Sequence, residues 1–224
     1  MTEATLTRDA LVIRAEEIQH ASRRGYWKAK RAFDFWVSLL LILLSSPLLF
    51  ILSILIFIDD PSGSPIFAQT RLGLHGKPFT MYKFRTMTVG AEMCREDLLA
   101  LNEMDGPVFK IRDDPRVTRV GRFLRRTSLD ELPQFFNVLM GDMSLIGPRP
   151  PLPSEVEEYT EYERLRLIVK PGLTCSWQVK SDRNGMTFAE WVEEDLEYIL
   201  HASFWTDVKL FLKTPLAMLR GEGC

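Results

Sequence analysis

The sequence is poor in the residues that usually hold metals or form disulfides. Its 224 residues include only three histidines and three cysteines, at Cys94, Cys175 and Cys224. The cysteines lie far apart and form no C-x-x-C pair, which argues against a disulfide framework and against a zinc site. The histidines are scattered, so the sequence indicates neither a metal cluster nor a serine–histidine relay. This composition fits a reducing, cytosol-facing location.

Several functional classes also lack their sequence signals. Lysine and arginine number 28, aspartate and glutamate number 30, and the net charge is −2. A nucleic-acid partner is therefore disfavoured, because such a partner normally requires a basic excess. The chain has no G-x-G-x-x-G, no P-loop, no G-x-S-x-G and no H-E-x-x-H motif. We find no internal repeat, which argues against a solenoid.

Charge is absent from one long stretch near the N-terminus. Residues 35–58 are 24 positions without a charged side chain, and about 20 apolar residues span a bilayer core as a helix. We expect Asp34, at the membrane entry, to pair with a nearby cation. A secretory signal peptide is the alternative, but the run is long and its basic flank begins late. The basic flank comprises Arg23, Arg24, Lys28, Lys30 and Arg31. By the positive-inside rule, these residues keep the N-terminus in the cytoplasm.

A helix breaker interrupts this apolar stretch at Ser45, Ser46 and Pro47. Proline removes one amide hydrogen bond and clashes with the preceding turn, and serine hydroxyls can satisfy the freed backbone groups in lipid. One interpretation is an ordinary spanning helix with a proline kink. The other is a re-entrant hairpin that turns at Ser46 and Pro47. Its two legs of about 13 residues would reach roughly 20 Å into a hydrocarbon core of about 30 Å.

The chain divides into three segments. Residues 1–22 are predicted to be a mobile tail, 23–60 the basic flank with the re-entrant membrane segment, and 61–224 a small cytosolic domain. Within this domain we expect a β-hairpin around "GLHGKP" and helices over 91–104, 129–140 and 187–200, the last opened by a Thr187–Glu190 capping box. An apolar, basic C-terminal helix would lie in the membrane interface. The predicted fold class is α+β and predominantly helical, with a helix-break-helix in the membrane.

Asp130 and Glu131 are the most conspicuous carboxylates, because they follow a run of arginines in "RRTSLDELPQ". One interpretation is purely structural: Ser128 and Glu131 have capping-box spacing, and acids in a first helical turn complement the helix dipole. The other is catalytic. A carboxylate can attack phosphorus when cations neutralise the phosphate, giving an acyl-phosphate intermediate.

The surrounding residue types suit phosphoryl chemistry. Arginine donates two parallel hydrogen bonds to a phosphate, and Mg²⁺ is satisfied by one or two carboxylates plus substrate phosphates. In this hypothesis Asp130 is the nucleophile, Glu131 holds Mg²⁺, and arginines bind the phosphates.

Long stretches of the chain support the catalytic interpretation: "KRAFDFWVSLLLILLSSP", "PIFAQTRLGLHGKPFTMYKFRTM", "DPRVTRVGRFLRRTSLDELPQFFNVLMGDMSLIGPRP", "KPGLT" and "DLEYILHASFWTDVKLFLKT". Together they resemble the bacterial sugar transferases, the monotopic phosphoglycosyl transferases. These enzymes are polyprenyl-phosphate hexose-1-phosphate transferases, which move a sugar 1-phosphate from a nucleotide sugar to polyprenyl phosphate. The block around "TSLDELPQ" is highly specific for this family. The structural interpretation of the acidic pair is still compatible with it, because one residue can both cap a helix and catalyse.

The resemblance implies a ping-pong reaction at the bacterial inner membrane, with the catalytic domain facing the cytoplasm. Asp130 would attack the β-phosphate of a UDP-sugar, release UMP and carry the phosphosugar until undecaprenyl phosphate accepts it. Glu131 would complete the catalytic pair and bind Mg²⁺. The product would begin an exopolysaccharide or capsule repeat unit, with glucose or galactose as the first sugars to test. The residues matching phosphate-handling or substrate-facing positions are Arg125, Arg149, Lys83, Arg85 and Arg183.

The resemblance leaves some points open. The family often has Q-V-x-G-R-N where this chain has "QVKSDRN", and glycine is frequent at the position of Cys175, so the donor pocket is the part least safely transferred. A homo-oligomer is neither required nor excluded. One rival hypothesis is a membrane-anchored, non-catalytic scaffold of a polysaccharide-assembly complex. Another is a metal-dependent glycosyltransferase, but the Asp-x-Asp motif common in that class is absent.

Overall fold

The computed structural model describes residues 24–94, 96–111, 113–181 and 185–219. Its fold is mostly helical with two small two-stranded sheets, which confirms the predicted α+β and predominantly helical class. The predicted tail, 1–22, lies outside the described residues. The helices are α2 (Arg24–Asp59), α3 (Arg119–Thr127), α4 (Gln134–Met140), α5 (Pro153–Glu157), α6 (Glu161–Arg164), α7 (Phe188–Leu200) and α8 (Phe204–Leu219); the strands are β1 (Ile66–Leu72), β2 (Pro78–Phe84), β3 (Ser144–Ile146) and β4 (Gly172–Thr174).

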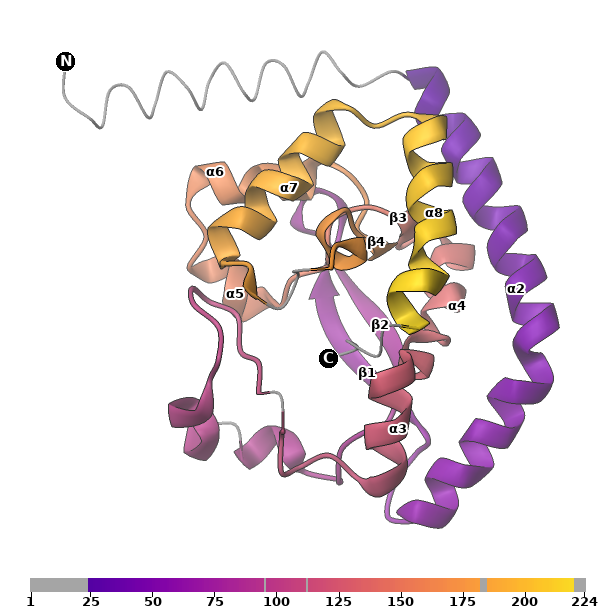
Figure 1. Ribbon diagram of the computed structural model, residues 1–224, viewed down its shortest axis with the longest axis vertical. Helices are drawn as coiled ribbons and strands as arrows, with labels where there is room; N and C mark the ends of the chain where they lie inside the picture. The colour runs from indigo at the N-terminus through magenta and orange to yellow at the C-terminus, as the bar shows by residue number, and fades with distance from the viewer. Residues whose placement is uncertain (1–23, 95, 112, 182–184, 220–224) are drawn as a thin grey trace.

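Helix α2 is the long apolar helix, and it differs from the prediction in one respect. The predicted helix-break-helix is a single helix of 36 residues that runs through Pro47 without interruption. The helix follows a bowed path along one side of the molecule (Figure 1). Among the described residues, α2 is the one helix long and apolar enough to cross a membrane.

The serine next to Pro47 explains how the helix continues. Proline has no N–H, so the carbonyl of Leu43, four residues earlier, loses its usual backbone donor. The hydroxyl of Ser46 donates to this carbonyl at 2.8 Å. Ser45 donates in the same way to Leu41 O at 2.6 Å. The two serine hydroxyls therefore bond to backbone carbonyls of the preceding turn, and the helix bends here instead of ending.

Both ends of α2 are bonded to the same folded body. Near its start, Arg31 donates to the carbonyls of Val138 and Leu139 at 2.6 and 2.7 Å, at the end of α4. At its end, Asp59 accepts from the Val120 amide at 3.0 Å, in the first turn of α3. Both ends of the helix are therefore fixed to the same domain.

A buried polar cluster fixes the start of α2. The carboxylate of Asp207 on α8 accepts hydrogen bonds from Lys30, Tyr26 and Tyr198 at 2.7, 2.6 and 2.7 Å. The predicted pairing of Asp34 with a cation takes a looser form: the charge of Lys30 acts on it, but among the described residues it has no ion pair in direct contact. It accepts from the backbone N–H of Leu145 at 3.2 Å instead.

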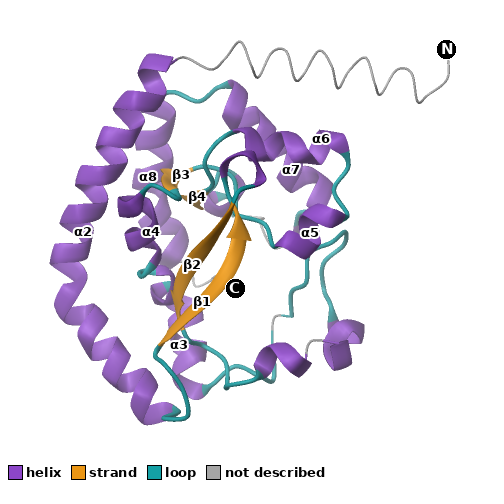
Figure 2. Ribbon diagram, turned by 180° about the vertical axis from the view of Figure 1, so that it is seen from behind, coloured by secondary structure: helices purple, strands orange, loops and turns teal. Residues whose placement is uncertain are grey.

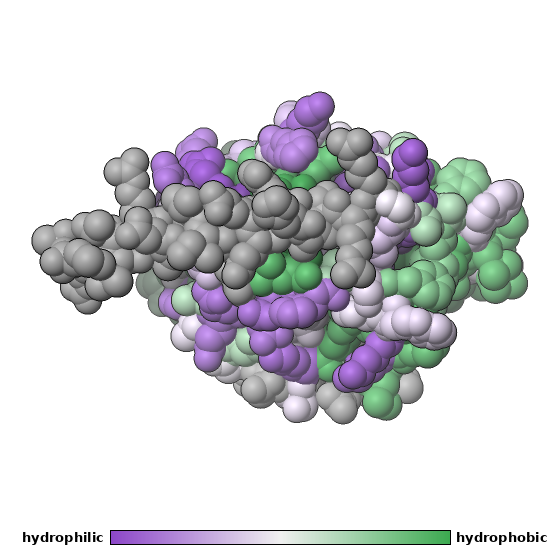
Figure 3. All heavy atoms as spheres, turned by 90° about the horizontal axis from the view of Figure 1, so that it is seen from above, coloured by the Kyte–Doolittle hydropathy of each residue, from purple (hydrophilic) through white to green (hydrophobic). Residues whose placement is uncertain are grey.

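One face of α2 is buried and the other is exposed. Leu52 and Ile56 pack against Phe84 and Leu124. Hydrophobic residues gather on the side of the molecule where α2 lies (Figure 3). On α2 the exposed large apolar side chains are Phe35, Trp36, Leu40, Leu43, Leu44, Leu48, Phe50, Ile51, Ile54, Leu55, Phe57 and Ile58, and on α8 they are Phe204, Trp205, Leu212 and Leu216. This surface is suited to lipid.

The predicted hairpin is confirmed. Strands β1 and β2 pair antiparallel from Ile66 opposite Phe84 to Leu72 opposite Pro78, and they form a twisted ribbon at the centre of the molecule (Figure 2). The chain reverses at η1, Leu74–Gly76, where His75 and Gly76 have φ values of 56° and 69°. Such left-handed conformations favour glycine.

Other elements differ from the sequence-based expectation. Residues 91–104 hold two 3-10 helices, Ala91–Cys94 and Glu96–Leu101, in place of an α-helix. The short parallel pair β3–β4 was not predicted. Helix α7 has the predicted capping box, in which the Thr187 side chain accepts from Glu190 N.

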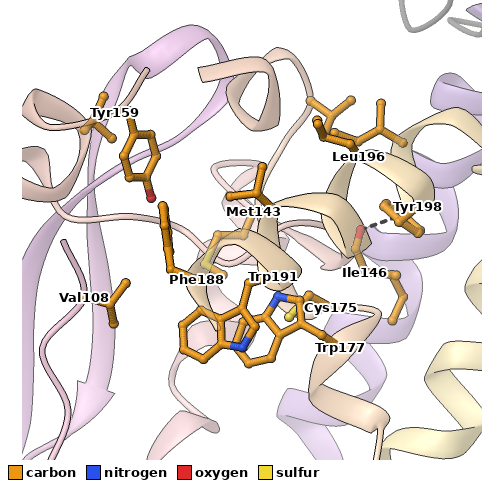
Figure 4. Packing of buried hydrophobic residues seen from close by; sticks show 14 of the residues in the cluster. Val108, Met143, Ile146, Tyr159, Cys175, Trp177, Phe188, Trp191, Leu196 and Tyr198 are labelled. Atoms are coloured by element: carbon orange, nitrogen blue, oxygen red, sulfur yellow. Dashed lines mark hydrogen bonds between the residues drawn. The ribbon is translucent and has the colours of Figure 1, made fainter. Parts of the chain in front are cut away.

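Helix α7 supplies much of the hydrophobic core. Trp191 stacks face to face on Trp177, with ring centroids 4.1 Å apart and planes within 4° (Figure 4). The buried Arg166 donates to Asp195 at 2.8 Å and to the Tyr159 hydroxyl at 3.1 Å. Trp177 and Trp191 also line the cavity described next.

Candidate active site

Asp130 and Glu131 lie in a short 3-10 turn, Leu129–Glu131, directly after α3. Ser128 ends α3 in the left-handed conformation, and its side chain makes no capping hydrogen bond. The capping-box interpretation of Ser128 and Glu131 is therefore wrong. Glu131 instead accepts from Lys83 Nζ on β2 at 2.9 Å.

Asp130 is the buried member of the pair. Its residue is 6% exposed, and burial raises the pKa of its carboxyl from 3.8 to about 6. Lys83 and Arg125 act in the opposite direction, since their positive charges favour the carboxylate, whereas Glu131 adds to the rise. Asp130 is thus a desolvated carboxylate that neighbouring cations keep ionised at neutral pH, which is the environment a nucleophilic carboxylate needs.

The two carboxylates line a cavity of about 470 Å³. Its lining carries more positive than negative charge. Among the described residues, five basic side chains and two acidic ones line it, namely Arg71, Lys83, Lys110, Arg125 and Arg149 against Asp130 and Glu131. An anionic ligand such as a diphosphate matches this excess.

Two of the predicted phosphate-binding arginines line this cavity. Arg125, on α3, donates from Nε to the Thr86 hydroxyl at 3.0 Å. Helix α3 can approach Thr86 because Gly121 has no side chain: a Cβ there would lie 2.0 Å from the Thr86 carbonyl oxygen. Arg149 is held by Glu155 through two hydrogen bonds of 3.0 and 3.3 Å. Both guanidinium groups are therefore fixed in position before any ligand binds.

Two other predicted residues are not part of this group. Arg85 is not among the cavity-lining residues; it pairs with Asp60 at 2.9 Å and also binds the Asp60 backbone carbonyl. It fixes the joint after α2. Arg183 lies outside the described residues.

Sequence reasoning missed Arg71, a cavity residue on β1. Its guanidinium donates to Gln69 Oε1 and to the Pro150 carbonyl. The available signal was weak, because one arginine in a strand is usually a solvated edge residue.

The cavity also reaches the apolar helices. Leu41 and Ser45 of α2 line it together with Phe211, Pro215 and Ala217 of α8. The polar end with Asp130 and the apolar end next to the lipid-suited surface are therefore parts of one cavity. Such a cavity can hold a ligand with a charged head and a hydrocarbon tail.

The carboxylate pair is compatible with Mg²⁺ when a phosphate ligand is also present. Among the described residues there is no group of three or more metal-ligating side chains. Mg²⁺ often takes only one or two carboxylates and completes its coordination with phosphate oxygens and water. Glu131, part-exposed and bonded to a single lysine, fits that limited role.

A buried carboxylate among fixed cations, in a cavity that reaches an apolar helix, is an arrangement that can serve phosphate chemistry at a membrane. Residues 25–221 match the family model described as bacterial sugar transferase. The chain belongs to this family. Its apolar helix and its family together indicate membrane association.

Several relatives have names that state an activity. The chain is 42% identical over 201 residues to undecaprenyl-phosphate galactose phosphotransferase of Salmonella typhimurium, covering 87% of this chain and 41% of the relative. It is 43% identical over 193 residues to UDP-glucose:undecaprenyl-phosphate glucose-1-phosphate transferase of Escherichia coli, covering 83% and 39%. It is 37% identical over 199 residues to the exopolysaccharide production protein ExoY of Rhizobium meliloti, covering 87% of each. The chain thus spans about two fifths of the first two relatives.

Proposed function

We propose that this protein transfers a sugar 1-phosphate from a UDP-sugar to undecaprenyl phosphate, releases UMP, and so begins a polysaccharide repeat unit. The observation that carries the proposal is the position of Asp130. It is a buried carboxylate flanked by Lys83 and Arg125, and its cavity runs from these charges to α2 and α8. The names of the relatives supply the substrate classes.

The first step uses Asp130 as the nucleophile. One carboxylate oxygen attacks the phosphorus that bears the sugar, the bond to the bridging oxygen breaks, and UMP leaves with that oxygen. The phosphosugar remains on Asp130 as an acyl phosphate. Lys83, Arg125 and Arg149 bind the phosphate oxygens and stabilise the charge that develops on them.

The second step returns the enzyme to its starting state. An oxygen of the lipid phosphate attacks the same phosphorus, and the bond to Asp130 breaks. The charged head of the acceptor would lie near Asp130, and its hydrocarbon chain would leave along Leu41, Phe211 and Ala217. Glu131 would hold Mg²⁺ together with the donor phosphates, and the ion would supply charge neutralisation at the diphosphate.

We further propose that α2 enters the cytoplasmic leaflet of the inner membrane and returns, so that the protein is monotopic. Both ends of α2 bind the same domain, and the UDP-sugar donor is cytosolic. Labelling each terminus with an impermeant reagent in sealed cells tests this topology. We expect neither terminus to react from outside, and reaction of one terminus alone would contradict the proposal.

The activity is tested with purified protein, Mg²⁺, undecaprenyl phosphate and a panel of UDP-sugars, with UMP release as the readout. We expect one UDP-sugar to be used and the lipid product to contain both sugar and phosphate. A product that contains sugar without the phosphate would identify a glycosyltransferase instead. No UMP release from any UDP-sugar would favour the scaffold hypothesis.

A further inference from the structure

Arg71 is a half-buried cation whose hydrogen-bond partners are all uncharged. Its Nε and one terminal nitrogen donate to Gln69 Oε1 at 3.1 and 2.8 Å. The other terminal nitrogen donates to the Pro150 carbonyl at 3.1 Å. These contacts use three of the five guanidinium N–H groups. Two N–H groups therefore have no partner within the described part of the chain, and the guanidinium lines the active-site cavity.

Arg149 lies close enough to Arg71 for the two charges to repel each other. The carboxylate next to them is Glu155, which is 2% exposed and which bonds to Arg149 and to the Leu152 amide. Two guanidinium groups therefore share one buried carboxylate, and the charge of Glu131 also acts on Arg71.

This arrangement is costly in the absence of a ligand. Burial, followed by the charge of Arg149, lowers the pKa of Arg71 to about 9, although Glu155 partly compensates. A bound anion would remove the repulsion and occupy the remaining N–H groups. The planar fork of arginine matches two oxygens of a phosphate.

We propose that Arg71 and Arg149 form a phosphate-oxyanion subsite in the cavity, next to the group that Lys83 and Arg125 form around Asp130. The inference rests on the proposed function, which supplies two sources of the same chemistry. One is the nucleotide phosphate that leaves as UMP. The other is the phosphate of the lipid acceptor.

The test compares Arg71→Gln and Arg71→Lys with Arg164→Gln. Arg164 is a matched control, because it also donates to backbone carbonyls, those of Tyr159 and Val156 at 3.3 and 2.7 Å, but it is not among the residues that line this cavity. For each protein we would measure thermal unfolding, the KM values for the UDP-sugar and for undecaprenyl phosphate, and inhibition by added UMP.

We expect Arg71→Gln to weaken the binding of one phosphate ligand by about ten- to a hundredfold, the usual effect of losing charge-assisted hydrogen bonds. Arg71→Lys keeps the charge but loses the fork, so its effect is expected to be smaller but still severalfold. Arg164→Gln should bind as the unchanged protein does. A higher KM for the UDP-sugar with weaker UMP inhibition assigns the nucleotide phosphate, and a higher KM for undecaprenyl phosphate assigns the lipid.

Unchanged KM values and unchanged UMP inhibition in folded Arg71→Lys, with Arg71→Gln unchanged or unfolded, would overturn the subsite. So would an equal loss of binding in Arg164→Gln. Failure of the unchanged protein to release UMP would instead contradict the proposed function, so the two failures are distinguishable.

Discussion

Charged side chains have different roles at the start of the membrane helix and in the active-site cavity. At the start of α2, Lys30 pairs with Asp207, and Arg31 binds the last carbonyls of α4. In the cavity, five basic side chains and two carboxylates form the charged part of the lining within the described residues. We call the start of α2, with Lys30 and Arg31, the anchor. The charged side chains of the anchor thus bond to other parts of the fold, whereas the cavity has an excess of positive side chains that suits an anionic ligand. Charge removal from the cavity should therefore impair function, and charge removal from the anchor should impair stability.

The largest effect is expected for Asp130→Asn. The amide cannot form the acyl phosphate, so UMP release should fall by at least about a thousandfold. Stability should rise in the same variant, by at most about 3 kcal/mol at pH 7.5. Burial raises the pKa of Asp130, so the ionised carboxylate destabilises the fold above pH 6, and asparagine removes this cost. UMP release and thermal unfolding measure the two effects, and a variant that is both active and less stable would contradict the comparison.

The next effect concerns the anchor. Asp207→Asn removes the ion-pair partner of Lys30, which is 4% exposed, and leaves it only the charge of Asp34, which makes no direct ion pair. The change should destabilise the protein by about 3–5 kcal/mol. Thermal unfolding in detergent tests this value. Glu197→Gln is the control, because it breaks an exposed pair with His201 and should cost less than about 1 kcal/mol. Equal unfolding temperatures for the two variants would contradict the claim that the buried Lys30–Asp207 pair stabilises the fold more than the exposed Glu197–His201 pair does.

A smaller effect is expected from pH. The pKa of Asp130 is about 6, so kcat/KM for UMP release should be level above that pH and fall about tenfold per unit below it as the nucleophile becomes protonated. Lys83→Gln removes the cation that most lowers this pKa, so its acid limb should move to higher pH. Arg122→Gln, at an exposed position on α3, should leave the midpoint unchanged. A profile without an acid limb near pH 6 would contradict the role of Asp130.

The smallest effect separates two serines of α2. Ser46→Ala removes the donor to Leu43 O, whose usual donor is missing because of Pro47, and should cost about 1 kcal/mol. Ser53→Ala removes a similar bond of 2.8 Å to Leu49 O, but that carbonyl also accepts from the helix backbone, so its cost should be smaller. Unfolding measurements in nanodiscs compare the two. A larger cost for Ser53→Ala would contradict the account of how the helix passes through Pro47.

The sequence predicted the elements whose signals are local. The turn residues around His75 indicate the hairpin, Thr187 and Glu190 indicate the start of α7, and the apolar run indicates α2. The motif around Asp130 also located the carboxylate pair. These predictions depend on backbone preferences and spacing over a few residues, which tertiary contacts did not override.

Other features depend on contacts between distant segments. Strands β3 and β4 have three residues each, too short for a period to be recognised. Lys83 and Arg85 are two apart and would share a face of a strand, but β2 ends at Phe84, so Arg85 turns to Asp60. Arg71 became a candidate only when the fold brought it next to Arg149.

The most direct test of the central claim is a single-turnover experiment without the lipid acceptor. The protein is mixed with the UDP-sugar it uses, and its intact mass and peptide masses are measured before and after addition of undecaprenyl phosphate. We predict release of one UMP per protein and a gain of one sugar phosphate on the peptide containing Asp130, which disappears when the acceptor is added. A protein that turns over with both substrates but gains no sugar phosphate on Asp130 would contradict the account.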